Sequence, residues 1–134
     1  MIKARLAGPP HLVDIEAAGH PLVADEPPLN GGADAGPAPF DLVLSGLAAC
    51  TLITLQMYAE RKGWPDFGAR AELRHRVQDG RHEIDRHVHV AGAPDEAGLA
   101  RLRDIVERTP VTLALKPGFV IVTTLNPATE GVRA

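Results

Sequence analysis

The sequence predicts an α+β protein with a mainly antiparallel sheet and a long buried central helix, in a single domain over residues 1–134. Three observations support this prediction. Segments near both ends of the chain alternate apolar and polar residues, as half-buried strands do. A long middle segment is apolar on nearly every face, which is typical of a helix that is covered all round. Turn-forming glycines and prolines separate these segments, and 134 residues fit one domain.

The N-terminal region predicts a three-stranded meander followed by a loop. Apolar and polar residues alternate over 2–6 and again over 11–17, on either side of the turn at Gly8-Pro9-Pro10. Ala18-Gly19 makes a second turn, and 21–24 is a short third strand. Residues 25–39 are too rich in proline and glycine for a helix or a central strand, so we expect a long loop there.

The strongest helix signal follows this loop. Pro39 suits a first helical turn, and Asp41 places a negative charge at the positive end of the helix dipole. Apolar residues then occupy nearly every face until the helix becomes polar at Glu60-Arg61-Lys62 and ends at Gly63-Trp64-Pro65. Such a helix needs cover on all sides, and one sheet in so small a chain covers one side only. We therefore expect a homodimer in which a second subunit supplies the remaining cover.

The second half of the chain predicts a hairpin, two helices and a last strand. Alternating residues over 67–77 and 84–90 flank a turn at Asp79-Gly80. Asp95 can cap a helix that stops at Pro110, and Pro110 can open a short third helix. The chain then turns into a final strand over 119–125, which is apolar enough to lie inside a sheet.

Composition and charge exclude several classes of function. A net charge of -3 argues against a general nucleic-acid binder, which needs a basic patch. A single cysteine leaves no intrachain disulfide and no four-cysteine metal site. No apolar signal core follows the positive charges at the N-terminus, and the apolar run over 42–55 is too short to span a bilayer. We therefore expect a cytoplasmic protein that binds neither nucleic acid nor a membrane.

Cys50 is the candidate for chemistry, although its context also fits a core residue. It lies mid-helix among alanines and leucines, and free cysteine is among the most buried residue types. A reactive thiol requires a nearby cation or a helix N-terminus. Cys50 lies nine residues past Asp41, about 13 Å along the axis at ~1.5 Å per residue, where the helix dipole no longer acts. The local sequence alone does not make Cys50 reactive.

The histidines of the hairpin raise the question of a metal site. His87 and His89 share one face of a strand, and His75 and His82 belong to the same hairpin. Their spacing fits no standard ligand motif, and the region is typical of a hairpin's solvated face. The glycine-rich loop at 30–36 matches no nucleotide-binding pattern. We therefore expect no metal and no cofactor.

The central segment resembles a known family signature. Residues 36–51, GPAPFDLVLSGLAACT, and their continuation at 57–64, MYAERKGW, are similar to the central helix of the OsmC/Ohr family. The order of elements also matches over nearly the whole chain. The resemblance implies an intertwined homodimer and a role in oxidative-stress defence, because many relatives reduce organic hydroperoxides with a peroxidatic cysteine. That cysteine aligns with Cys50, and the acidic helper of the family aligns with Asp41.

Two positions depart from the pattern of the active relatives. Thr109 stands where they carry a resolving cysteine, so turnover would need an external thiol reductant. We expect Thr109 to cap the helix that begins at Pro110 instead. The relatives also carry an activating arginine before the central helix, where this chain has only Arg5. Arg108, next to Thr109, is the candidate substitute.

The site residues leave geometry and function open. Helical periodicity puts Asp41 on the opposite side of the helix from Cys50, so a shared site needs Asp41 from a second subunit or a break in the helix. One hypothesis is thiol-dependent reduction of organic hydroperoxides by Cys50. Another is a non-catalytic dimer that binds a small apolar ligand in a pocket lined by Cys50. A third is a structural or interaction module with no pocket between its subunits.

Overall fold

The structure is a computed structural model that describes residues 1–128 and divides into two compact units. The first unit comprises Met1–Leu42 and the described residues from Val122 onward, and the second comprises Val43–Ile121. The predicted α+β class is confirmed by antiparallel strands and one long helix. The strands of the described residues form two separate sheets rather than one. A single domain over residues 1–134 stays a prediction.

The first unit contains a three-stranded antiparallel sheet. Its strands are β1 (Ile2–Leu6), β2 (Val13–Ala17) and β3 (His20–Ala24), paired in the order β1-β2-β3. The predicted turn between β2 and β3 is confirmed, since Ala18 and Gly19 have positive φ angles of 51° and 89°. Two successive residues of positive φ give the tight turn that matches the twist of a hairpin.

The loop after β3 is organised around the buried carboxylate of Asp25. Oδ1 accepts a hydrogen bond from the backbone N–H of Glu26 at 2.8 Å, and Oδ2 accepts from those of Ala33 at 3.2 Å and Ala35 at 3.0 Å. The bonds from Ala35 and then Glu26 are the main causes that hold the pKa of Asp25 below its usual value. The predicted loop is therefore an ordered structure.

A close backbone approach and a single 3-10 turn complete this loop. The turn, η1, spans Pro28–Asn30. A Cβ added at Gly32 would lie 1.9 Å from the carbonyl oxygen of Glu26, so any side chain there would force the backbone apart.

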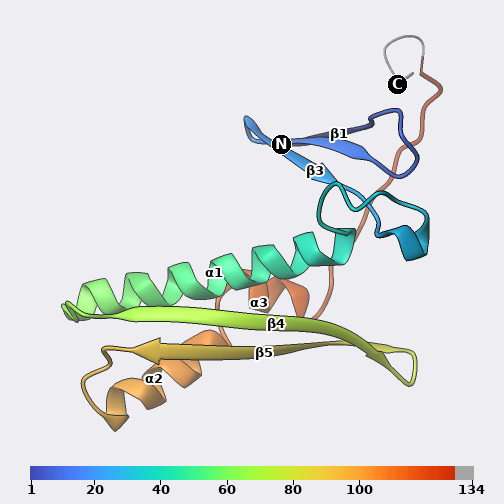
Figure 1. Cartoon of the computed structure of the whole chain (residues 1–134). Helices are drawn as coiled ribbons and strands as arrows, with labels where there is room; N and C mark the ends of the chain where they lie inside the picture. Colours follow the sequence, from blue (N-terminus) through green and yellow to red (C-terminus); the bar gives the residue numbers. More distant parts are fainter. Residues whose placement is uncertain (129–134) are drawn as a thin grey trace. The chain divides into compact units, whose positions relative to one another are not determined.

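The second unit contains most of α1 (Pro39–Lys62), which runs along a hairpin of β4 (Gly68–Gln78) and β5 (Arg81–Ala91) (Figure 1). Helices α2 (Glu96–Val106) and α3 (Pro110–Leu115) follow the hairpin. One stripe of α1 is buried, at a spacing of four residues that keeps the side chains on one face. Its members are Leu47, Thr51, Leu55 and Ala59.

Local signals correctly predicted the ends of these elements. Asp79 and Gly80 join β4 to β5 with positive φ angles of 51° and 73°. Asp95 caps α2, because its side chain accepts a hydrogen bond from the backbone N–H of Gly98 at 2.8 Å. Pro110 is the first residue of α3.

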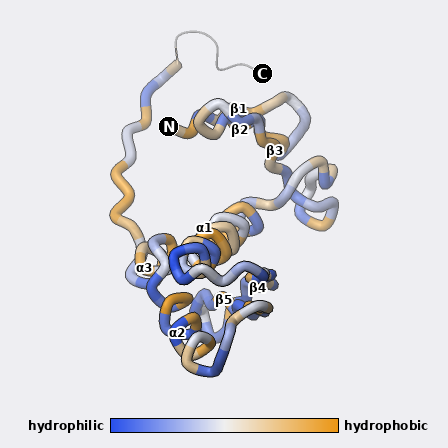
Figure 2. Tube along the Cα trace, turned by 90° about the vertical axis from the view of Figure 1, so that its left-hand side faces the viewer, coloured by the Kyte–Doolittle hydropathy of each residue, from blue (hydrophilic) through white to orange (hydrophobic). Residues whose placement is uncertain are grey.

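The face of α1 opposite the buried stripe is apolar and exposed. Ile53 and Met57 on this face are 53% and 56% exposed, and Val43, one turn before Leu47, is 44% exposed. Figure 2 shows hydrophobic residues along the helix. By length and composition alone, this helix of 24 residues is apolar enough to cross a membrane. The apolar run considered from the sequence, 42–55, covers only part of this helix, and the absence of a membrane partner stays a prediction. The core helix of a soluble protein passes the same test of length and composition.

The final strand predicted over 119–125 is absent from the described residues. This segment pairs with no strand there, and its apolar side chains are exposed. An apolar sequence indicates that a segment can be a strand, but the strand forms only where another edge supplies hydrogen-bond partners. The exposed residues are Phe119, Val120, Ile121, Val122 and Leu125.

Candidate functional site

Cys50 lies half-buried in the middle of α1. It follows Leu47 by three residues, so the two side chains are neighbours on the helix surface. Leu47 and Thr51 belong to the buried stripe, whereas Ile53 and Met57 are exposed. At ~100° per residue, the thiol therefore lies at the boundary between the buried stripe and the exposed apolar face.

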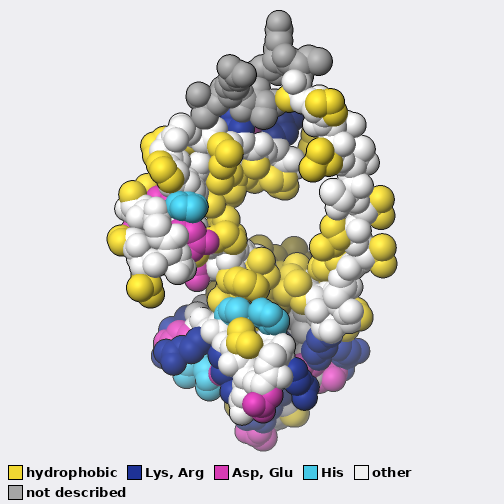
Figure 3. All heavy atoms as spheres, turned by 90° about the vertical axis from the view of Figure 1, so that its right-hand side faces the viewer, with side chains coloured by type: hydrophobic (Ala, Val, Ile, Leu, Met, Phe, Trp, Pro, Cys, Tyr) yellow, Lys and Arg dark blue, Asp and Glu magenta, His cyan; other side chains and the backbone are white. Residues whose placement is uncertain are grey.

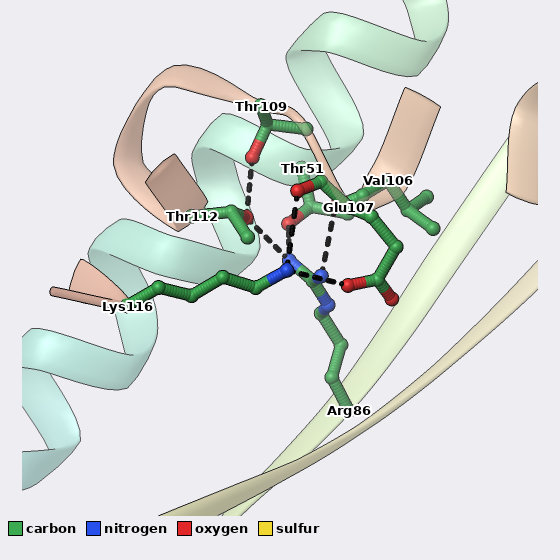
Figure 4. Close-up of polar contacts among 7 residues, drawn as sticks. All are labelled: Thr51, Arg86, Val106, Glu107, Thr109, Thr112 and Lys116. Carbon is green, nitrogen blue, oxygen red and sulfur yellow. Dashed lines mark hydrogen bonds and ion pairs between the residues drawn. The ribbon is translucent and has the colours of Figure 1, made fainter. Parts of the chain in front are cut away.

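Arg86 of β5 connects this turn of α1 to the two following helices (Figure 4). Its Nη1 donates hydrogen bonds to Thr51 Oγ1 and Thr112 Oγ1, each at 2.9 Å. Its Nη2 donates to the carbonyl oxygen of Val106, the last residue of α2, at 2.8 Å. One guanidinium group thus joins α1, the end of α2 and α3 beside the residue that follows Cys50.

The strand alternation puts Arg86 on the inner face of the hairpin. In the antiparallel register it lies opposite Leu73, and it shares its face of β5 with Ile84 and Val88. A half-buried arginine at such a position needs polar partners, and the three oxygens supply them. Sequence reasoning missed Arg86, although a charged residue that interrupts an apolar alternation was a signal that could have identified it.

The charge of Arg86 has no ion-pair partner among residues 1–128. Its three hydrogen bonds go to two hydroxyls and one carbonyl oxygen, which are neutral. Glu107 lies close by, but its carboxylate binds Lys116 Nζ at 2.9 Å. The hydrogen bond from Lys116 is the main cause that lowers the pKa of Glu107, and the charge of Arg86 contributes less.

Thr109 is fully buried at the N-cap position of α3, but it does not cap the helix with its side chain. Its hydroxyl lies 2.6 Å from Thr112 Oγ1, a hydrogen-bond distance (Figure 4). The predicted cap is therefore wrong, because Thr112 offers a hydroxyl that Arg86 already orients. The chain of bonds from Thr109 through Thr112 and Arg86 to Thr51 ends next to Cys50.

The arginines considered from the sequence are bound elsewhere. Arg108 is 55% exposed and pairs with Asp104 of α2, so the expectation that it substitutes for the activating arginine is not supported. Arg5 pairs with Asp14 across β1 and β2 at 2.7 Å. In the second unit, Arg86 is the cation that the fold brings to the turn of α1 that contains Cys50.

Asp41 lies in the first turn of α1, as predicted. Its Oδ2 accepts a hydrogen bond from the backbone N–H of Ala38 at 3.2 Å. The helix is unbroken from Pro39 to Lys62, so a break that would bring Asp41 towards Cys50 of the same chain does not occur.

Two pockets border Arg86 within the second unit. The first, of ≈ 490 Å³, is called the Arg86 pocket below; its wall includes Leu47, Ile84, Leu115, Thr112 and Lys116. The second, of ≈ 310 Å³, lies between β5 and α2 and is lined mainly by aliphatic side chains. Cys50 is not among the lining residues of either pocket, but its neighbour Leu47 lines the first.

The hairpin histidines do not converge on one point. His75 Nε2 lies 2.9 Å from His82 Nδ1, with the rings stacked, on the same face as Leu73. The register puts His87 and His89 on the opposite face. Figure 3 shows histidine and charged side chains over the surface of this unit. The described part of the chain contains no group of three or more residues that could hold a metal ion.

Several solved structures have the same fold, and three of them are of proteins named OsmC or Ohr. An OsmC-like protein from Mycoplasma pneumoniae has a TM-score of 0.69 and 22% identity, and the match covers 84% of each chain. An organic hydroperoxide resistance protein OsmC from Legionella pneumophila has a TM-score of 0.58 and 21% identity, over 87% of this chain and 88% of that one. The organic hydroperoxide resistance protein OhrB of Bacillus subtilis has a TM-score of 0.57 and 20% identity, over 87% and 89%.

Sequence comparison gives the family directly. No curated protein matches the chain. The family model described as OsmC-like protein matches residues 31–124, a range that contains α1, the hairpin and both later helices. The chain therefore belongs to the OsmC-like protein family.

Proposed function

We propose that this protein reduces organic hydroperoxides with Cys50 as the nucleophile and an external thiol as the reductant, in oxidative-stress defence in the cytoplasm. Membership of the OsmC-like family supports this function, and two structures with the same fold are of organic hydroperoxide resistance proteins. The observation that supports it most directly is the position of Cys50, half-buried on the turn of α1 that Arg86 fixes.

The proposed reaction uses one protein sulfur and two external thiols. The Cys50 sulfur attacks the terminal oxygen of R–O–OH, the O–O bond breaks, and the alkoxide leaves as R–OH after taking up a proton. The product is Cys50–S–OH. An external thiol R′–SH then forms Cys50–S–S–R′ and water, and a second R′–SH restores Cys50–SH and releases R′–S–S–R′. The external thiol is required because Thr109 has no sulfur with which to resolve the sulfenic acid.

We propose that the protein works as a homodimer. The exposed apolar face of α1 and the unpaired apolar segment 119–125 support this assembly, because contiguous apolar surface is uncommon on soluble monomers. In a symmetric dimer, the same two apolar surfaces of a second copy can cover the α1 face and the segment 119–125. In such a dimer, Asp41 of the partner subunit can serve as the acidic helper of Cys50. Replacement of the exposed Ile53 by Asp should give monomers in analytical ultracentrifugation, whereas replacement of the exposed polar Gln56 should not.

A turnover assay tests the proposed enzyme. Cumene hydroperoxide and dithiothreitol are mixed with the protein, and the loss of hydroperoxide is followed with time. The wild-type protein should accelerate this loss, Cys50→Ser should not, and Gln56→Ala on the same helix should retain the wild-type rate. Equal rates for the wild-type protein and Cys50→Ser would exclude the proposed reaction.

A second candidate function is the binding of a small apolar ligand by a non-catalytic dimer in which Cys50 lines the pocket. The exposed apolar face of α1 beside Cys50 favours it. Equal binding of an apolar fluorescent probe by the wild-type protein and Cys50→Ser, together with no hydroperoxide loss, would select this function.

A further inference from the structure

Arg86 has hydrogen-bonding capacity that the described residues do not use. A guanidinium group has five N–H donors, and three of them bond to Thr51, Thr112 and Val106. The Nε–H and one N–H of Nη2 therefore have no protein acceptor within residues 1–128. No buried side-chain nitrogen of these residues lacks a partner, so Nε is an accessible atom. Arg86 lines both the Arg86 pocket and the second pocket, so a ligand in the Arg86 pocket can approach its guanidinium group.

The other charged groups at this pocket are already held by protein partners. Lys116 Nζ binds the Glu107 carboxylate at 2.9 Å, so this pair adds little net charge. Asp85 lies on the opposite face of β5, where Arg76 Nε binds it at 2.9 Å. Arg86 alone among these groups has only neutral partners. The pocket therefore offers one cation without a counter-ion.

The shape of the pocket indicates an organic anion. Two N–H donors of one planar guanidinium suit the two oxygens of a carboxylate. Leu47, Ile84 and Leu115 line the same pocket and can contact an aliphatic body. Because Leu47 lines the pocket and is a neighbour of Cys50 on α1, a small molecule bound by its carboxylate to Arg86 can extend past Leu47 towards the Cys50 thiol.

From these observations we infer that the Arg86 pocket binds the carboxylate of the thiol that regenerates Cys50, so that the reductant is a small acidic thiol. This inference rests on the proposed function, in which Cys50 requires an external reductant. The bound thiol attacks Cys50–S–OH through its sulfur, an S–S bond forms, and the hydroxyl leaves as water with the proton of the thiol. A second molecule of the same thiol then attacks the mixed disulfide and releases its own disulfide.

The test measures thiol exchange, which does not depend on the hydroperoxide step. Cys50 is first converted to its pyridyl disulfide, and the release of thiopyridone is followed by absorbance. Thioglycolate is the acidic thiol, and mercaptoethanol is the neutral thiol of similar length. Each rate is divided by the rate of the same thiol with a free cysteine pyridyl disulfide, which removes differences in intrinsic reactivity. For the wild-type protein, the normalised rate with thioglycolate should be about tenfold higher than that with mercaptoethanol. A charge-assisted hydrogen bond in a partly open pocket gives a preference of this size.

Two variants and one competitor complete the test. Arg86→Gln should reduce the preference to near one, whereas Arg70→Gln, at an exposed position on the outer face of β4, should leave it unchanged. Sodium acetate, which competes for the carboxylate site, should slow the reaction with thioglycolate but not the reaction with mercaptoethanol. Sodium chloride at the same ionic strength is the reference. This competition uses the wild-type protein, so it remains decisive if Arg86→Gln does not fold.

Three outcomes would overturn the inference. They are no preference in the wild-type protein, the same preference in Arg86→Gln, and no effect of acetate. If Arg86 instead favours a carboxylate-bearing hydroperoxide over a neutral one in the turnover assay, with no effect on the thiols, the carboxylate belongs to the substrate and the assignment to the reductant is wrong. Failure of the proposed function would be a separate result, namely normal exchange with no hydroperoxide loss.

Discussion

Asp25 in the first unit and Arg86 in the second are both charged side chains whose described hydrogen-bond partners are neutral. Three backbone N–H groups bind the Asp25 carboxylate, which is 2% exposed. Three neutral oxygens bind Arg86, which remains half-buried and keeps two N–H groups open at a pocket. The backbone closes around Asp25, whereas the helices close around only one side of Arg86.

This difference separates a charge that organises structure from a charge that can also bind a ligand. A buried charge must be stabilised by dipoles or an opposite charge, and both residues meet this requirement with dipoles. Asp25 is sealed by its own loop, so its contribution is to the order of that loop. Arg86 both holds three helices together and offers donors to a solute.

Asp25→Asn should give the largest loss of stability. An amide has one acceptor oxygen, so at least one of the three backbone N–H groups would face an NH₂ group. We expect the midpoint of thermal unfolding to fall by on the order of 10 °C. Asp34→Asn, at an exposed position in the same loop, is the matched control and should change the midpoint little. Equal midpoints for the two variants, measured by circular dichroism, would show that the Asp25 carboxylate does not organise the loop.

The pH dependence of stability should follow the carboxylate of Asp25. Because the pKa of Asp25 in the folded protein is lower than the ordinary value of 3.8, the folded state binds fewer protons than the unfolded chain. The stabilisation is therefore complete above the ordinary pKa and is lost as the pH falls through the lowered pKa. The midpoint of thermal unfolding of the wild-type protein should fall steeply below about pH 4. The midpoint of Asp25→Asn should depend less steeply on pH. Parallel curves would contradict this attribution.

Arg86→Leu should cost less stability than Asp25→Asn. Thr51 keeps its hydrogen bond to the carbonyl oxygen of Leu47, and Thr112 keeps its contact with Thr109, so only the carbonyl oxygen of Val106 loses its partner. We expect a loss of about 1–3 kcal/mol in urea unfolding. If Arg86→Leu were as stable as the wild-type protein, the three hydrogen bonds would not hold the helices together.

Thr109→Val should have the smallest effect. The two side chains have nearly the same shape, and Thr112 keeps its hydrogen bond from Arg86. The lost contact between the two hydroxyls should cost about 1 kcal/mol. A much larger loss in the same urea titration would mean that Thr109, rather than Arg86, holds α3 in place.

Much of the fold could be predicted because its signals are local. The central helix begins at Pro39 and is polar at its end, and Asp79-Gly80 and Asp95 define a turn and a cap through their own backbone neighbours. The strand expected over 119–125 does not form within residues 1–128, because strand formation depends on a partner edge, which can lie far along the chain or on another chain. An apolar pattern indicates that a segment can form a strand, but it does not identify the strand with which the segment pairs.

The candidate site could be predicted only in part for the same reason. The position of Cys50 on the central helix follows from the helix itself. The cation near this turn of the helix could not be predicted from the sequence, because Arg86 binds Thr51 across a sequence separation of 35 residues. Arg108, close in sequence to Thr109, was the candidate cation, but a surface pair with Asp104 holds it. Proximity in sequence was therefore a poor guide to which arginine the fold brings to the site.

Formation of a sulfenic acid on Cys50 can be detected from the intact mass of the protein after one equivalent of cumene hydroperoxide in the presence of dimedone, which traps sulfenic acids. We predict one dimedone adduct per chain, located on Cys50 by peptide mapping and absent from Cys50→Ser. A folded wild-type protein whose Cys50 remains unmodified would show that Cys50 is not the nucleophile.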